Sequence, residues 1–187
     1  MSNLGRILRP KRSAHTVRTV EREDAVAANE RDNVSRVALG ADHGGLAAKE
    51  TLKVYLGSLG YRVVDMGTFN TDSVDYPDIA VKVADAVASG ACERGIMIDG
   101  AGIGSSMVCN KVRGVRAALC YDLATVRNSR EHNNANVLTL GGPRHEADVL
   151  CEMARVWLET RFEGGRHWPR INKMMAVERR RHHDQLQ

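Results

Sequence analysis

The chain has 187 residues, of which 43% are hydrophobic, 27% charged and only 4% aromatic, and its net charge is +4. This length suits one domain, no apolar run reaches the roughly eighteen residues of a membrane helix, and the few aromatic residues disfavour a stacking platform for single-stranded nucleic acid. Four cysteines without metal-type spacing predict reduced thiols in a reducing compartment, for which we expect the cytoplasm, and not disulfides or a zinc site.

The positive charge lies at the two ends of the chain. Residues 1–36 hold eight Lys/Arg and five Asp/Glu, residues 161–187 hold seven and three, and residues 37–160 hold twelve and fifteen. Solvated basic ends explain this pattern better than a nucleic-acid or membrane partner does. We therefore predict a flexible basic extension over residues 1–35. Its acid-free residues 1–20 leave open a transit peptide or an arm that docks on a partner.

From Arg36 onward, short apolar runs alternate with amphipathic stretches. The expected strands are 36–41, 61–66, 95–98, 115–119 and 137–140; the expected helices are 48–59, 79–87, a segment through Lys111, 122–131 and 150–158. This alternation predicts right-handed βαβ units, and hence a Rossmann-like three-layer α/β/α sandwich around a five-stranded parallel sheet. Such folds bind ligands beyond the carboxyl ends of their strands, where polar residues become candidates for a site.

Two polar clusters directly follow predicted strands. Asp42-His43-Gly44-Gly45 follows the first strand; its glycines would let the backbone approach a ligand, although a capping Asp with a turn His is equally consistent. The third strand is followed by Asp99-Gly100-Ala101-Gly102-Ile103-Gly104-Ser105-Ser106, whose glycines can expose successive N–H groups. The glycine spacing does not fit a dinucleotide fingerprint and the P-loop lysine is missing. An anion or oxyanion loop is therefore favoured over a nucleotide site or a structural turn.

Two more clusters lie before the fifth strand and in the tail. Four of the five residues from His132 to Asn136 are His or Asn, a density that predicts contact with a polar ligand or bridges between loops. Residues 164–170 read Gly-Gly-Arg-His-Trp-Pro-Arg, which suits phosphate binding. By itself, a basic turn before a terminal helix with Pro169 at its first position is the simpler interpretation of this segment.

Taken together, these motifs resemble the family of ribose-5-phosphate isomerase B and galactose-6-phosphate isomerase. The resemblance runs from about Arg36 to about Glu178 and rests on GADHGG, DYP, GIMIDGAGIG followed by Asn110-Lys111, REHNNAN and GGRHWPR, in order and at the right spacing. It implies an aldose–ketose isomerase acting on a phosphorylated sugar without metal, nucleotide or other cofactor. It also implies a homodimer, or a tetramer, with active sites between subunits. Residues 36–162 would form the isomerase domain, and residues 163–187 a tail for phosphate binding and dimerisation.

The resemblance also implies roles for residues after the first and third strands. Asp42 and His43 would contact substrate hydroxyls or the ring oxygen, while Tyr76 and Ala101 would line the pocket. Backbone N–H groups would hold the enediolate oxygen, and they belong to Gly100, Gly102 and Gly104.

The remaining implied roles fall on the third and fourth clusters. His132 would assist ring opening with Asn133 beside it. The substrate phosphate would be held near the partner's pocket by Arg166, His167 and Arg170.

The chain departs from the family pattern at the proton-transfer group. Many members carry a cysteine base where this chain has Asp99, and others a glutamate base where it has Ser105. Where the family usually has Thr or Ser two residues after the cysteine position, this chain has Ala101. The arginine that often follows the glycine pair after the fifth strand is replaced by Pro143, and Arg144 comes one position later. We predict that Asp99 is the base, because a carboxylate can also carry a proton between carbons. Cys109 and Cys120 are expected to be core residues.

Three functions follow from these observations. The first is isomerisation of ribose 5-phosphate or a related four- to six-carbon sugar phosphate through an enediolate. The second is a non-catalytic sugar-phosphate binder or regulatory subunit of the same fold, which the combination of Asp99 and His132 disfavours. The third is a nucleotide-binding module, which the glycine spacing disfavours.

Overall fold

The computed structural model describes residues 34–183, with side chains described as far as Glu178. Almost all of the predicted extension 1–35, including the proposed docking arm 1–20, therefore lies outside the described residues. From Val34 onward the chain forms one compact unit. Among the described helices, none is both long and apolar enough to cross a bilayer.

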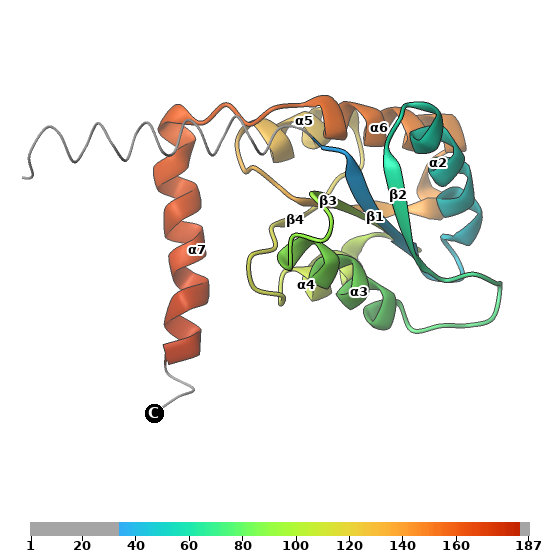
Figure 1. Ribbon diagram of the computed structural model, residues 1–187, viewed down its shortest axis with the longest axis horizontal. Coiled ribbons are helices and arrows are strands. Elements are labelled where there is room, and N and C mark those ends of the chain that lie inside the picture. Colours follow the sequence, from blue (N-terminus) through green and yellow to red (C-terminus); the bar gives the residue numbers. More distant parts are fainter. Residues whose placement is uncertain (1–33, 184–187) are drawn as a thin grey trace, which may run out of the picture. The chain divides into compact units, whose positions relative to one another are not determined.

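The described segment alternates strands and helices as far as residue 159, and one more helix follows (Figure 1). The strands are β1 (Arg36–Ala41), β2 (Arg62–Gly67), β3 (Arg94–Asp99), β4 (Ala117–Leu119) and β5 (Val137–Gly141). The α-helices are α2 (Leu46–Ser58), α3 (Tyr76–Ala88), α4 (Ile103–Cys109), α5 (Leu123–Glu131), α6 (Ala147–Glu159) and α7 (Trp168–His183). Two 3₁₀ turns, η1 (Gly142–Arg144) and η2 (Gly165–His167), precede α6 and α7. The predicted strands and helices are all present.

Several boundaries differ from the predicted ones by a few residues, and side-chain hydrogen bonds explain two of these differences. Helix α4 stops at Cys109 instead of Lys111, because the Asn110 side chain bonds to both backbone groups of Ala117. Strand β4 starts at Ala117 instead of Val115, because the Arg116 amide donates to the Asn136 side chain at 2.7 Å. Helix α7 begins at Trp168, so Pro169 is its second residue and not its first.

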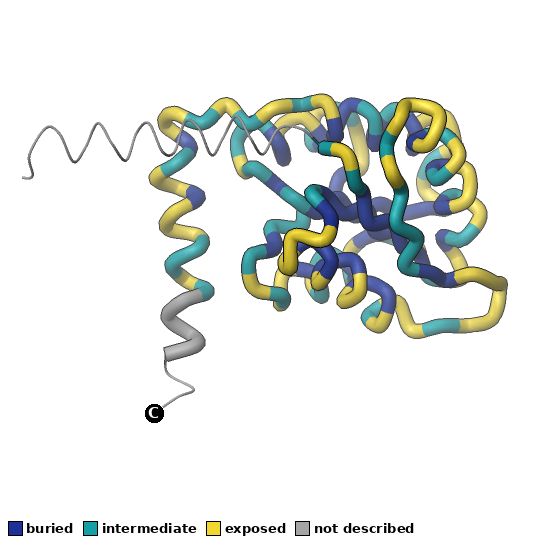
Figure 2. Tube along the Cα trace, viewed as in Figure 1, coloured by how far each residue is buried: buried dark blue, intermediate teal, exposed yellow. Residues whose placement is uncertain are grey.

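The five strands form one parallel sheet in the order β2-β1-β3-β5-β4. Helices α2, α5 and α6 cover one face and α3 and α4 the other, as Figure 1 shows. The central strands are apolar on both sides and are the most deeply buried part of the unit (Figure 2), as expected for a parallel sheet between two helical layers. The predicted Rossmann-like sandwich is confirmed.

A buried ion-pair network fixes edge strand β2 against α2. The Lys49 ammonium is fully buried and donates to Asp65 Oδ1 at 2.7 Å, and Lys53 donates to Asp65 Oδ2 at the same distance. Partial burial of Asp65 would raise its pKa, but hydrogen bonds from Lys49, Lys53 and the Gly67 amide outweigh that effect and hold the pKa below its ordinary value. Asp65 therefore stabilises the fold as long as it is ionised.

We expect Asp65→Asn to lower the free energy of unfolding by about 2 kcal/mol at pH 7, because the buried Lys49 ammonium then keeps only the more exposed Glu50, 2.8 Å away, as a counter-ion. A carboxylate with a depressed pKa stabilises the fold above its unfolded pKa of about 3.9 and loses this effect as pH falls through the folded pKa. The gap between wild type and variant should thus shrink below about pH 4. Urea unfolding from pH 7 to pH 3 measures it, with exposed Asp85→Asn as control. A gap that stays constant with pH would contradict this assignment.

Candidate active site

The carboxyl ends of β1 and β3 meet at the point where the strand order reverses. Strand β1 lies between β2 and β3, and Ala41 of β1 is in register with Ile98 of β3. The chain leaves β1 for a helix on one face and enters β3 from a helix on the other, which is the switch-point geometry at which open α/β sheets bind ligands. The predicted clusters beginning at Asp42 and Asp99 therefore lie side by side.

The turn after β1 holds Asp42 and His43 at this edge. The Asp42 amide donates to the Ile98 carbonyl at 3.1 Å, and its carboxylate accepts from the Gly45 amide at 2.9 Å. A Cβ at Gly45 would lie 2.6 Å from the Ile98 carbonyl oxygen, so only glycine permits this close approach of backbones. His43 Nδ1 accepts from the Val74 amide at 3.3 Å, which ties the turn to the loop before α3.

Asp99 is the last residue of β3, at the start of the glycine loop, and its carboxylate is surrounded by donors. Its side chain is buried, and Oδ1 accepts from the amides of Ala101 (2.7 Å) and Gly102. Oδ2 accepts from the amide of Ser105 at 3.2 Å and from its hydroxyl at 2.5 Å. Gly102 has φ +75° and a Cβ there would strike Leu119, so the loop needs glycine at this position.

The loop is thus an anion cradle whose occupant in this structure is Asp99. Of the amides predicted to hold an enediolate oxygen, that of Gly102 bonds to Asp99, whereas those of Gly100 and Gly104 are not among the four donors to the carboxylate. Asp99 and Ser105, which stand at the two positions where the resembling family carries its base, are in direct contact.

Tyr76 covers the start of α4. It is the first residue of α3, and a Cβ at Gly104 would lie 2.5 Å from its ring. The ring is 38% exposed, so it borders the glycine loop without sealing it. Asp42, His43, Tyr76 and the loop from Asp99 to Gly104 make up the carboxyl-edge cluster.

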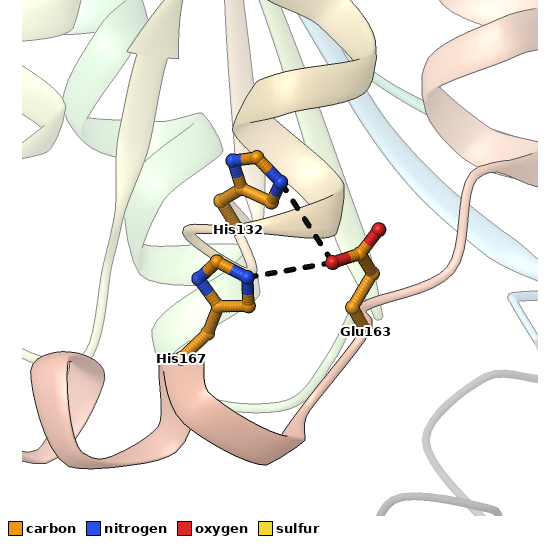
Figure 3. A group of neighbouring side chains, drawn as sticks. All are labelled: His132, Glu163 and His167. Carbon is orange, nitrogen blue, oxygen red and sulfur yellow. Dashed lines mark ion pairs between the residues drawn. The ribbon is translucent and has the colours of Figure 1, made fainter.

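A second group gathers around His132, at the C-terminal end of α5. The His132 and His167 rings are stacked, with centroids 4.3 Å apart and planes 9° apart. Glu163 Oε2 lies 3.7 Å from His132 Nε2 and 3.4 Å from His167 Nε2 (Figure 3). Arg166 Nε donates to His167 Nε2 at 3.3 Å, and Asn128 Nδ2 lies 2.9 Å from His132 Nδ1. Neither Glu163 nor Asn128 was predicted, although each lies four residues before a histidine that it contacts, a spacing that could have drawn attention to them.

Asn133, Arg166 and Arg170 are exposed beside the histidine pair. Asn133 donates to the backbone carbonyl and to the side-chain oxygen of Asn128, both at 3.3 Å. We call the group formed by His132, Asn133, Glu163, Arg166, His167 and Arg170 the amino-edge cluster.

The two clusters lie at opposite ends of the strands, the first at their carboxyl ends and the second at their amino ends. Asp99 ends β3 and pairs with Gly141 at the end of β5, whereas His132 and Asn133 precede the first residue of β5, Val137. The Glu163 amide donates to the Glu131 carbonyl at 3.0 Å, which holds the start of the tail at this same amino edge. Five strand residues span roughly 15 Å, so one chain cannot bring both clusters to one small substrate.

Comparison with known proteins identifies the family of the chain. The family model described as Ribose/Galactose Isomerase matches residues 37–174. A solved structure of ribose-5-phosphate isomerase B from Clostridium thermocellum is 45% identical with a TM-score of 0.76, covering 78% of this chain and 98% of that one. The chain belongs to the Ribose/Galactose Isomerase family. The predicted family and enzyme class, a sugar-phosphate isomerase, are confirmed.

Two curated members of the Ribose/Galactose Isomerase family differ in the substrate that they are named for. Ribose-5-phosphate isomerase B of Escherichia coli is 37% identical over 148 residues, which cover 79% of this chain and 99% of that protein. D-Erythrulose-4-phosphate isomerase of Pectobacterium atrosepticum is 36% identical over 148 residues, covering 79% and 97%. Family membership therefore does not choose between a five-carbon and a four-carbon sugar.

In this family member, the other motif residues have structural roles. Asn136 bridges Arg116 and Gly114, and Asn134 accepts from the buried guanidinium of Arg130, so part of the dense His/Asn segment connects loops.

The four cysteines are buried and free, as predicted. Burial, reinforced by the nearby charge of Asp99, raises the pKa of the Cys109 thiol to about 12, which suits a core residue.

Proposed function

We propose that the chain interconverts ribose 5-phosphate and ribulose 5-phosphate, or a related aldose and ketose phosphate of four to six carbons. The observation that carries this proposal is the carboxylate of Asp99 among loop amides at the sheet's switch point, in a member of an isomerase family. Moving a carbonyl between C1 and C2 requires a base beside the substrate and fixed donors for the oxygen that becomes charged. The glycine loop supplies both.

In the proposed reaction, Asp99 takes the proton from C2 of the open-chain aldose, a proton passes from the C2 hydroxyl to the C1 oxygen, and Asp99 returns its own proton to C1, which leaves the carbonyl at C2. As the carboxylate gains a proton, its negative charge passes to the substrate oxygen, forming the enediolate. The amides of Ala101 and Gly102, which hold the ionised carboxylate, then become available to the new oxyanion. Because the charge moves from one acceptor to another beside the same donors, the loop needs little rearrangement.

The amino-edge cluster supplies ring opening and phosphate binding from a second copy of the chain. Arg166 and Arg170 are exposed and suited to a phosphate, and His132 lies next to them through its stacked partner His167. Binding the phosphate away from the reacting carbons fixes the sugar so that one base reaches both C1 and C2. The proposed assembly is a homodimer in which each site joins the carboxyl edge of one chain to the amino edge of the other.

A panel of aldose phosphates from four to six carbons, assayed for ketose formation, tests the substrate. We expect ribose 5-phosphate to be converted with the highest kcat/KM, since the relatives from Clostridium thermocellum and Escherichia coli are named ribose-5-phosphate isomerase B. Highest activity on a four-carbon phosphate would move the assignment towards the substrate of the relative from Pectobacterium atrosepticum.

Proton exchange separates an isomerase from a binding subunit of the same fold. An isomerase that works through an enediolate should incorporate deuterium from heavy water at C1 or C2 of its substrate, as nuclear magnetic resonance detects. Tight binding of sugar phosphates with neither exchange nor ketose formation would instead establish the non-catalytic binder.

A further inference from the structure

The amino-edge cluster brings three potential metal ligands to one point. They are Nε2 of His132, Nε2 of His167 and a carboxylate oxygen of Glu163, and these atoms all lie within 4.8 Å of one another. In Figure 3 the carboxylate faces both rings. His132 caps the C-terminal end of α5, whereas Glu163 precedes η2 and His167 is the last residue of η2, so the fold brings His132 to a pair of residues that are close in sequence.

The two distances from Glu163 suit a borderline transition-metal ion, whereas the stacked histidine rings, with planes 9° apart, must turn towards each other before both nitrogens can reach one ion. Zinc binds imidazole nitrogen at about 2.0–2.1 Å and carboxylate oxygen at about 2.0–2.2 Å, so neighbouring ligands around a tetrahedral ion lie roughly 3.3 Å apart. Glu163 Oε2 lies 3.4 Å and 3.7 Å from the two histidine nitrogens, close to that spacing. Two histidines and a glutamate leave the fourth position open, as in catalytic zinc sites.

The surroundings of the three ligands both support and oppose metal binding. The Asn128 side chain lies 2.9 Å from the far ring nitrogen of His132. With its amide turned over, it would accept from that nitrogen and leave Nε2 for the metal, at the cost of the bond that its oxygen now accepts from Asn133. Arg166 Nε donates to the very nitrogen of His167 that the metal needs, so this guanidinium must swing away. Arg166 is exposed and can do so.

We propose that His132, Glu163 and His167 form an inhibitory site for a transition-metal ion of the zinc class. The occupied site withdraws both histidines from the sugar phosphate, and the cation competes with Arg166 for the same space. The binding site rests on the proximity of the three side chains, and it requires the two rings to rotate and Arg166 to move away. The inhibition rests on the proposed function, in which these histidines contact the substrate.

Calorimetric titration of the full chain with ZnCl₂, and visible absorption of the Co²⁺-loaded protein, test the binding site. We expect Glu163→Gln, which keeps shape but removes the charged ligand, to weaken binding at least about tenfold and to lose the tetrahedral Co²⁺ bands. The matched control is Glu159→Gln, a glutamate held by Arg155 on α6, and it should bind within about twofold of wild type. Arg166→Ala should bind more tightly than wild type. Equal binding by wild type and Glu163→Gln would overturn the site.

Isomerase assays test the inhibition separately from the binding. Zn²⁺ should inhibit the wild type in competition with the sugar phosphate, and a chelator should restore activity. Unchanged activity of a chain that calorimetry shows to be saturated with Zn²⁺ would overturn the inhibitory role. A chain that isomerises no sugar phosphate would refute the proposed function instead, while the titrations would still decide the site.

Discussion

Replacing Asp99 by asparagine is expected to lower kcat by about 10²–10⁴-fold with little change in KM, because a positioned general base contributes that much to proton transfer. Asparagine keeps the size of the side chain, and its oxygen can still accept from the amides of Ala101 and Gly102. Its NH2 group can donate to the Ser105 hydroxyl but no longer accepts from the Ser105 amide, so the loop loses one of its four bonds to this side chain. Asparagine cannot accept a proton from carbon. Steady-state kinetics with the best substrate of the panel, together with substrate binding by calorimetry, measures the effect.

The matched variant is Asp99→Cys, which introduces the cysteine base that many members of the family carry. We expect it to recover much of the activity lost in Asp99→Asn and to become sensitive to iodoacetamide, because the thiolate would now be the base. The native enzyme should resist the reagent, since its four cysteines are buried and Cys109 has a pKa of about 12. Near-normal turnover of Asp99→Asn would remove Asp99 from the mechanism.

Mixing two inactive variants should restore activity if each site is shared between two chains. We expect dimers that combine Asp99→Asn with the double variant Arg166→Ala/Arg170→Ala to contain one intact site out of two. Random pairing makes half of the dimers mixed, so co-expression at equal levels should restore about 25% of wild-type activity. The physical reason is that Asp99 and the two arginines lie at opposite edges of the sheet of one chain.

A control pair distinguishes shared sites from simple stabilisation by mixing. Asp99→Asn with Asp42→Asn places both defects at the carboxyl edge, so every mixed dimer has two defective sites and no recovery is expected. Recovery by this pair, or no recovery by the first pair in mixed dimers verified by mass spectrometry, would contradict the shared site.

The alternation of apolar strands and amphipathic helices determined the fold from the sequence alone. Period and spacing are local properties, so each strand and helix could be found, and right-handed crossovers then left few ways to assemble the sheet. The end of α4 at Cys109 and the start of β4 at Ala117 could not be predicted, because they depend on hydrogen bonds between Asn110 and Ala117 and between Arg116 and Asn136.

By itself, the sequence determined the family and the identity of the candidate residues, since its five motifs occur in order along the chain. Only the tertiary structure decided which of them meet: Asp99 joins its own loop amides at one edge of the sheet, and His132 joins His167 and the unpredicted Glu163 at the other. The reason is that a strand places the residue before it and the residue after it at opposite ends of the sheet, separated by the length of the strand. Residues close in sequence can therefore lie far apart, and residues distant in sequence can lie at the same end of the sheet.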